Sequence, residues 1–429
     1  MPLDKEPLPN SSSIEFIVPH LEQLLTINGE DGDKIKNLRF ENITFAHTNW
    51  LRPNDFGLGH VDLQANFILN QNENGFFYDR GLAGIEVNYA NRVHFERCTF
   101  TKMGSAALDF FLGVTNSTVR GCIFDDLSGT GINVGDINSQ MTISDPRLCI
   151  NNSIVNNYFT NIAVEYKGGH AIWTGYVKDT KIEHNEISGT AYTAISVGWG
   201  WSGSQTACRN NSIQYNHISN YMMEMKDGGA IYTLSLQNNT KIQYNHIHDG
   251  GGSALYPDEQ TWNTTWRYNV GYRSGNSLQD HTLGEERTST SIRENEISNN
   301  YFDMKPIIEP DRQKIHIPNN IWNISEYPDS SILAIVSDAG LEPNYADLLI
   351  GSEKIRKKDK PGLYWSDLID EKKPFDDPFL FWTIIAAISG IALLGITKIS
   401  MKDLDKTSNI PQNRKDQLIN KTKANMRYE

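Results

Sequence analysis

Residues 213–218 read IQYNHI, and the same six letters return 29 residues later at 242–247. Units of the same kind, apolar at both ends, recur along most of the chain at intervals of 24 to 35 residues from Phe95 onward. A repeat of this length indicates a solenoid, in which each copy packs only on its neighbours. The other units begin at Phe40, Phe95, Val119, Ile154, Ile182, Trp266 and Ile292.

A second strand-like segment follows six of these units at a nearly constant distance. Its start lies 12 residues after the start of the first segment in four coils and 17 residues after it in two. A constant offset with occasional longer loops is typical of a parallel β-helix, in which insertions are confined to the corners. These segments are ALDF from Ala107, GINV from Gly131, AIWT from Ala171, AISV from Ala194, AIYT from Ala230 and ALYP from Ala254.

The fourth position of the unit is polar although its neighbours are apolar. Stacked asparagines at an inward bend can hydrogen-bond to one another and to buried main-chain groups, so we interpret them as structural. Cys98 and Cys122 begin the same column, and we expect them to be buried thiols rather than a disulfide. The predicted column continues with Asn157, Asn185, Asn216, Asn245, Asn269 and Asn295.

The other two cysteines leave an alternative open. Cys149 and Cys208 each precede a related Asn-Asn-Ser-Ile run, so a disulfide between loops is compatible with an oxidising exterior. The spacing of cysteines and histidines matches no zinc motif. The sequence therefore predicts neither a metal site nor a cofactor.

The predicted solenoid occupies residues 1–326 and is all-β, a right-handed parallel β-helix. Residues 51–83 interrupt the repeat, and an insertion of this length usually covers the end of a helix or walls a site. Residues 327–350 lose the repeat and predict a short helical cap. Residues 351–377 are charged and contain proline, which is typical of a stalk.

Charge is divided unevenly along the 429 residues, which carry 39 Lys and Arg against 52 Asp and Glu, a net charge of −13. This balance argues against a nucleic-acid surface. Residues 378–397 hold no charged side chain and are long enough for a transmembrane helix. The tail 398–429 has a net charge of +4, and a basic flank is retained in the cytoplasm. We therefore expect a single-pass membrane protein with an extracellular N-terminal part and a cytoplasmic tail.

Eight Asn-x-Ser/Thr sequons precede the apolar segment and favour a glycosylated ectodomain. The first residues contain no apolar stretch typical of a signal peptide, which favours a sequence that is incomplete at its N-terminus. The oligomeric state does not follow from the sequence. The sequons lie at Asn10, Asn42, Asn116, Asn151, Asn210, Asn238, Asn263 and Asn323.

Aromatic and acidic residues gather on three successive coils. Trp199 and Trp201 follow one inner strand, while Tyr232 and Tyr256 lie in the next two. Sugars stack their C–H faces on such rings and hydrogen-bond to nearby polar groups. We therefore predict an oligo- or polysaccharide partner, bound by these four residues together with His248 and Glu259.

Cleavage of a glycosidic bond needs two carboxyl groups, and Asp227 and Asp258 form the candidate catalytic pair. Asp249 is a reserve acid. On a straight strand the two would lie about 20 Å apart, so the pair requires a bend. Asp227 before Gly-Gly is also compatible with an ordinary turn, and Asp258-Glu259 with a solvated corner.

These motifs resemble a known group of proteins. The series FAHTNW (45–50), AISVGWGW (194–201), KDGGAIYTL (226–234) and LYPDE (255–259) is similar to β-helix proteins of glycoside hydrolase family 141 and its relatives. The likeness runs roughly over residues 17–350. It implies a glycosidase acting on plant-type or complex glycans, with Asp227 and Asp258 at the positions of the family's two acids.

The sequence departs from that pattern near the second acid. Pro257 stands where an aliphatic residue is usual, and Gln260-Thr261 replace Gly-Ser. A non-catalytic glycan-binding or adhesion ectodomain with the same fold is therefore the alternative. A polysaccharide lyase ranks third, because it would need a calcium-binding acidic cluster and a base, for which Lys226 and Arg267 are the nearby residues.

Overall fold

The computed structural model describes residues 17–52, 64–72, 75–137, 142–201, 203–282, 295–308, 317–324 and 330–350. The chain divides into two units, and all of the described residues belong to the first, Met1–Trp365. The expected stalk at 351–377, apolar segment at 378–397 and basic tail at 398–429 all lie outside the described residues. Within the described ranges, no helix is both long and apolar enough to cross a membrane.

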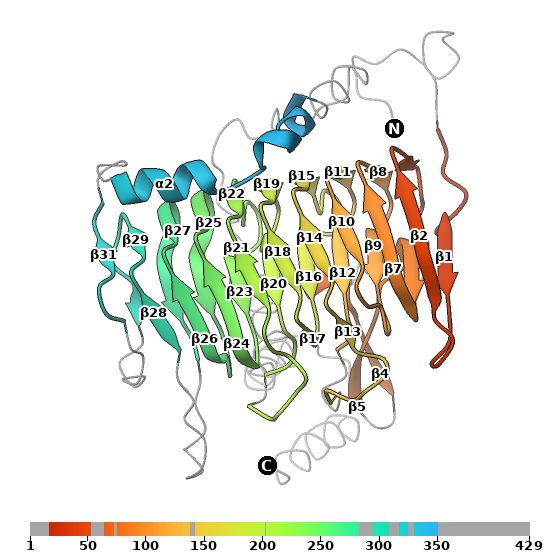
Figure 1. Ribbon diagram of the computed structural model, residues 1–429, viewed down its shortest axis with the longest axis horizontal. Helices are drawn as coiled ribbons and strands as arrows, with labels where there is room; N and C mark the ends of the chain where they lie inside the picture. Colours follow the sequence, from red (N-terminus) through yellow and green to blue (C-terminus); the bar gives the residue numbers. More distant parts are fainter. Residues whose placement is uncertain are drawn as a thin grey trace, which may run out of the picture. The chain divides into compact units, whose positions relative to one another are not determined.

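The described residues of the first unit form a parallel β-helix, as predicted, whose strands stack coil upon coil (Figure 1). Each full coil contributes a strand to each of three faces. The first face is a nine-stranded parallel sheet. It consists of β2 (Ile35–Glu41), β7 (Ala90–Glu96), β10 (Thr118–Arg120), β14 (Ser153–Val155), β18 (Lys181–Glu183), β21 (Ser212–Gln214), β24 (Leu236–Gln243), β26 (Trp262–Arg267) and β28 (Glu296–Ser298).

The second and third faces are joined through the long strands β25 (His246–Pro257) and β27 (Val270–Asp280), which run across both. The second face also holds β3 (Thr44–Ala46), β8 (Thr99–Met103), β11 (Ile123–Leu127), β15 (Tyr158–Ile162), β19 (Glu186–Thr190), β22 (His217–Ser219), β29 (Tyr301–Phe302) and β31 (Ile321–Trp322). The third also holds β1 (Leu25–Asn28), β6 (Ala83–Asn88), β9 (Ala106–Phe110), β12 (Ile132–Val134), β16 (Ile172–Thr174), β20 (Ile195–Val197), β23 (Gly229–Thr233) and β30 (Ile307–Ile308).

Among the described residues, two short pairs of strands lie outside the three faces. A short parallel pair, β13 (Cys149–Ile150) with β17 (Val177–Lys178), lies beside the first face. The insertion at 51–83 contains the 3-10 turn η1 (Gln64–Asn66) and an antiparallel hairpin of β4 (Ile68–Asn72) and β5 (Gly75–Asp79). The insertion therefore has structure of its own, outside the stacked coils.

The corner between the first and second faces is a two-residue turn that repeats in every coil. Its first residue has a positive φ, as in Tyr215 at 54° and Tyr244 at 56°. From Asn157 onward its second residue is an asparagine whose amide donates to the asparagine of the next coil, for example Asn216 to Asn245 at 3.0 Å. The same amide donates to a main-chain oxygen of the coil before, Ile182 O at 2.9 Å. The predicted asparagine column is therefore a ladder that satisfies buried polar groups.

The register of the last coils differs from our prediction. Asn269 donates to Asn300 at 2.8 Å, and Asn300 donates to Asn320 at 2.9 Å. Asn295 lies five residues earlier, at the other end of the first face, where it accepts from Thr264. The unit expected at Ile292 is therefore wrong, because Ile297 is the residue that pairs with Trp266. Both ends of β28 carry a buried asparagine, so the letters alone do not distinguish the two registers.

A second polar column explains four of the eight sequons. At the corner that enters the first face, an exposed or half-exposed asparagine precedes an inward polar residue, as in Asn210 before Asn211. Positive φ values are found at Asn116, Asn151 and Asn210, where asparagine is a favoured residue. The side chains also bond from coil to coil, Asn151 to Asn116 at 2.7 Å. The recurrence of Asn-x-Ser/Thr at Asn116, Asn151, Asn210 and Asn263 therefore has a structural cause, whereas Asn238 lies one residue before the corner residue Asn239.

The remaining sequons have less in common. Asn42 and Asn323 are exposed and also have positive φ, while Asn10 lies outside the described residues. Whether any sequon carries a glycan stays a prediction.

All four cysteines are buried thiols. Cys98 and Cys122 extend the asparagine ladder, since the Cys122 amide donates to Asn157 at 3.0 Å, and our expectation for this pair is confirmed. Cys149 and Cys208 are also free, and the Cys208 thiol donates to Gln237 at 2.9 Å. The disulfide considered for this second pair is therefore wrong, because two coils separate the residues. Burial raises the pKa of Cys149 to about 12 and that of Cys208 to about 11.

The segment 330–350 lies along the side of the solenoid rather than over its end. It contains α2 (Ser330–Asp338), seen in Figure 1 beside the edges of β25 and β27, and the 3-10 turn η2 (Pro343–Tyr345). Ile332 and Ile335 of α2 pack with Tyr272 of a late coil. Further along, Arg97 of an early coil donates to Asp347 at 2.8 Å. The expected cap is therefore a strap that crosses the coils, because the outward side chains of the first corner offer it a continuous surface.

We expect Asn216→Ala to lower the free energy of unfolding by about 3 kcal/mol, since it leaves several buried main-chain and amide groups unpaired. The measurement is denaturant unfolding of the purified chain. Lys241→Ala, at an exposed position of β24, is the matched control and should change the value by less than about 0.5 kcal/mol. Equal effects of the two substitutions would contradict a stabilising ladder.

Candidate active site

Asp227 lies just before β23, in a left-handed conformation with φ of 59°. Its main-chain oxygen accepts a hydrogen bond of 2.8 Å from the Tyr192 hydroxyl, and its carboxylate accepts one of 2.9 Å from the Tyr256 hydroxyl. The next residue has to be glycine, because a Cβ on Gly228 would lie 2.5 Å from Thr193 Oγ1. The turn in KDGG is thus both a bend and the support of a carboxylate.

Asp258 follows the end of β25, directly beside β23. The ladder brings Tyr232 opposite Tyr256 and Thr233 opposite Pro257. The Asp258 amide then donates to Thr233 O at 3.0 Å, while Pro257 O accepts from the His281 amide at 2.9 Å. The unusual proline therefore keeps its place in the sheet, and Asp258 remains in register.

The side chain of Asp258 is held from two sides. The Tyr232 hydroxyl donates to Oδ2, and His281 Nδ1 lies 2.8 Å from Oδ1. Asp258 is 4% exposed, whereas the His281 side chain is 29% exposed. A buried carboxylate with a partner at each oxygen is geometrically well fixed.

The two carboxyl groups are electrostatically coupled. Burial raises the pKa of Asp227, and the negative charge of Asp258 raises it further, against the opposing hydrogen bond from Tyr256 and the charge of His281. The pKa values of Tyr232 and Tyr256 are also raised, mainly by burial and by Asp258. The two carboxyl groups are thus linked through Tyr256 and Tyr232, whose rings pack edge to face.

The aromatic residues predicted to bind sugar divide into two groups. Tyr232 and Tyr256 are each 1% exposed, with ring centroids 5.2 Å apart, so their hydroxyls position carboxylates and their faces are covered. Trp199 is 5% exposed and packs against Tyr78 and Trp173. These three predicted sugar-stacking roles need correction, because neighbouring coils cover the rings.

Trp201 keeps a partly exposed ring. It packs against Tyr232, Leu234 and Tyr256 and lies 5.5 Å from Trp199, centroid to centroid. Tyr78 of the insertion approaches Trp201 at 6.4 Å. The insertion at 51–83 was expected either to cover the end of the β-helix or to wall a site. The contact with Trp201 places it beside the candidate site.

Of the other residues predicted for the site, Glu259 lies beside the carboxyl pair, whereas His248 and Asp249 lie away from it. Glu259 is half-buried next to Asp258, and its main-chain oxygen accepts from Ser235 at 3.1 Å. His248 and Asp249 lie on the second face, where the Arg273 guanidinium keeps the pKa of Asp249 far below its usual range. The reserve acid is therefore wrong, since an acid so paired stays ionised and belongs to another cluster.

The residues named for a lyase also fail to converge. Arg267 is on the first face and pairs with Glu296, away from the third-face carboxylates. Lys226 is exposed beside Asp227. In the part of the chain that the structure describes, no acidic cluster of three or more ligand residues is found that would hold calcium.

His281 was missed by sequence reasoning. Leu278 pairs with Leu255, so SLQDH is the next coil after ALYPD, and His281 takes the place of Asp258. The register of β25 against β27 shifts between Gly250 and Ser253. In this coil the distance from the start of the first-face segment to the start of the third-face segment is therefore one residue less than the usual 12. In the sequence, the apolar Leu278 was the available sign that SLQDH is a third-face segment, although the segment begins with serine instead of alanine or glycine.

The comparisons with known proteins agree with the fold. Residues 27–148 match the family model described as right handed beta helix region. A solved structure described as a glycoside hydrolase is 29% identical, with a TM-score of 0.57, and the alignment covers 77% of this chain and 54% of that one. The chain thus spans about half of the length of that glycoside hydrolase. No curated protein matches.

Weaker likenesses extend to other carbohydrate-active proteins. The GH136 lacto-N-biosidase from Eubacterium ramulus is 10% identical with a TM-score of 0.40, over 72% of this chain and 60% of that one. The pectate lyase Pel9A is also 10% identical with a TM-score of 0.40, over 74% and 70%. The strand pairing and the family-model match together show that the fold is a right-handed parallel β-helix.

The raised pKa of Asp227 predicts a pH-dependent stability. The folded chain binds more protons at this group than the unfolded chain between the ordinary Asp value near 3.8 and the raised value, so its contribution to stability falls as pH rises through that window. The stability of Asp227→Asn relative to the parent should therefore increase between pH 4 and pH 7. Denaturant unfolding at the two pH values measures the difference.

Asp145→Asn is the control of opposite sign. A hydrogen bond from Arg147 lowers the pKa of Asp145, so the parent gains stability from this group above its unfolded pKa and loses it as pH falls. Relative to the parent, this variant should lose stability as pH rises between the lowered pKa and the ordinary Asp value near 3.8, so its difference is measured between about pH 3 and pH 4. A shift of both variants in one direction would contradict the electrostatic assignment of Asp227.

Proposed function

We propose that this protein is a glycoside hydrolase, with Asp227 and Asp258 as its two carboxyl groups. The observation that carries the proposal is the pair of tyrosine-held carboxylates on adjacent coils of the third face. The likeness to the glycoside hydrolase structure at 29% identity supports it. The narrower assignment to glycoside hydrolase family 141 rests on the sequence motifs.

Asp227 is the proposed general acid. Its raised pKa favours the protonated form that gives a proton to the leaving oxygen. It is also the more accessible of the two, half-buried where Asp258 is buried. Trp201, with its partly exposed ring, is the proposed stacking surface for a sugar.

Asp258 is the proposed second carboxylate, and His281 is the group through which it reaches solvent. Both Asp258 oxygens are engaged, by Tyr232 and by His281, and only the imidazole is substantially exposed. A carboxylate that orients a histidine in this way makes the imidazole a base able to activate water. Glu259 lies next in the chain as a polar group for sugar hydroxyls.

The second candidate is a non-catalytic glycan-binding ectodomain of the same fold. The burial of Asp258 favours it, because a carboxylate that is 4% exposed and hydrogen-bonded at both oxygens is poorly placed to attack a sugar carbon. For either function we propose the location that the sequence suggests, a single-pass membrane protein with the β-helix outside the cell. The apolar segment at 378–397 and the basic tail support that location.

The test is the release of reducing sugar from a panel of complex and plant-type glycans by the full chain. Asp227→Asn and Asp258→Asn should each lower kcat by about 100-fold or more on the responsive glycan. His281→Gln should lower kcat by a similar factor only if Asp258 acts through the imidazole of His281.

Asp179→Asn is the matched control, because Asp179 lies at an exposed corner where neighbouring coils carry asparagine. It should leave turnover unchanged. Binding of a glycan without turnover by the parent chain would support the binding module instead, and an unsaturated product would support a lyase.

A further inference from the structure

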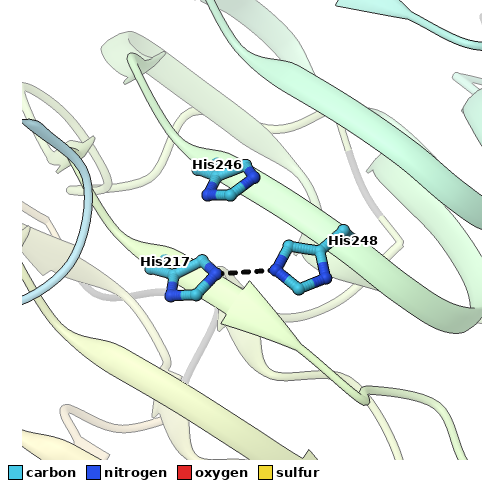
Figure 2. Close-up of side chains that lie close together, drawn as sticks. All are labelled: His217, His246 and His248. Atoms are coloured by element: carbon cyan, nitrogen blue, oxygen red, sulfur yellow. Dashed lines mark hydrogen bonds between the residues drawn. The ribbon is translucent and has the colours of Figure 1, made fainter. Parts of the chain in front are cut away.

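Three histidines converge on the outer side of the second face, away from the carboxyl pair. His217 begins β22 and pairs in register with His246 of β25, and His248 lies two residues further along β25 on the same side of the strand. Figure 2 shows the three rings turned toward one another. One ring nitrogen from each lies within 4.8 Å of the other two.

Two of these nitrogens meet directly. Nε2 of His217 and Nε2 of His248 are 2.8 Å apart (Figure 2). The opposite nitrogen of each ring faces a carboxylate. Glu186 Oε1 lies 2.7 Å from Nδ1 of His217, and Asp249 Oδ2 lies 2.6 Å from Nδ1 of His248.

This arrangement determines where protons can be. A carboxylate accepts hydrogen bonds, so each Nδ1 carries the proton that it shares with Glu186 or Asp249. In a neutral ring the other nitrogen, Nε2, then presents a lone pair. Two lone pairs at 2.8 Å repel each other unless a cation lies between or beside them.

The cation is either a proton or a metal ion, and the geometry favours the metal ion. A single proton can bridge only the Nε2 atoms of His217 and His248, whereas a metal ion can also be bound by the nearby ring nitrogen of His246. Neutral imidazole is the form that binds metal ions.

We propose that His217, His246 and His248 form a binding site for a divalent transition metal ion, with zinc as the best match. Three imidazole ligands with a further open position are typical of zinc sites. Glu186 and Asp249 would then be the carboxylates that orient the ligand rings, a support that metal-bound histidines commonly have. Arg273 holds Asp249 in turn, at 2.6 Å.

The site is accessible from solvent. The side chains of His217 and His248 are 24% and 17% exposed, so an ion can enter. With zinc–nitrogen bonds of about 2.0–2.1 Å in tetrahedral geometry, two ligand nitrogens lie about 3.3 Å apart. The Nε2 atoms of His217 and His248 therefore have to separate by roughly 0.5 Å, and the ring nitrogen of His246, which lies within 4.8 Å of the others, has to move closer to them.

The strap covers one side of this cluster. A Cβ placed on Gly340 would lie 2.8 Å from Glu186 Oε2 and 3.1 Å from the Cβ of His217, so the strap backbone passes directly over both. Gly340 itself has a φ of 90° and donates from its amide to Tyr215 O at 2.7 Å. Metal binding is therefore expected to stabilise the contact between the strap and the coils.

The first test is zinc binding by the full chain. After removal of bound metal with a chelator, calorimetric titration with zinc chloride should show about one equivalent bound, with a Kd below about 1 µM. His217→Gln and His248→Gln should weaken binding at least 100-fold, and Glu186→Gln should weaken it 10- to 100-fold. His94→Gln, a half-buried histidine on the outer side of the first face, is the control and should leave binding unchanged.

The second test needs no variant. X-ray absorption of the zinc-loaded parent chain should show about three imidazole nitrogens near 2.0 Å. Thiolate ligands near 2.3 Å, failure of the parent chain to bind zinc, or an unchanged Kd in His217→Gln would each overturn the proposal. None of these readouts depends on glycan cleavage, so they are independent of the proposed hydrolase activity.

Discussion

The rest of the β-helix depends on one turn, a residue at positive φ followed by a buried asparagine. Each asparagine amide joins two coils, since it donates both to the next asparagine and to a main-chain oxygen of the coil before. Buried main-chain groups at a corner have no water to bond, so every coil must bend at the same place. Side chains at equivalent positions are thereby stacked. The carboxyl pair, the histidine cluster and the surface under the strap are all products of that stacking.

Much of the fold follows from the sequence because this turn is local. The alternation of apolar residues around a polar fourth position identifies the first-face strands, and the constant offset identifies those of the third face. The register fails near Ile292, where Asn295 and Asn300 both occupy inward polar positions five residues apart. The strap was mistaken for a cap because its partners, from Tyr272 to Arg97, are distant in the sequence.

The candidate sites show where local reasoning ends. Asp227 and Asp258 are recognisable from their coil positions, but the burial of Tyr232, Tyr256 and Trp199 depends on neighbouring coils and insertions. The sequence therefore favoured sugar stacking for rings whose faces are covered. The histidine cluster escaped prediction for a related reason. Its ligands come from two coils, so no fixed spacing of the kind found in zinc motifs connects them.

The sequons illustrate how a fold can imitate a signal for modification. The corner before the first face often has an asparagine at positive φ, then an inward polar residue, then an outward residue that begins a strand. Serine and threonine suit the third position, so Asn-x-Ser/Thr arises in coil after coil. Side chains such as Asn151 already donate from their amide nitrogen to the neighbouring coil, and a glycan on that nitrogen would replace one of its two N–H donors. The number of sequons is therefore not independent support for an extracellular location, which rests instead on the apolar segment at 378–397 and its basic flank.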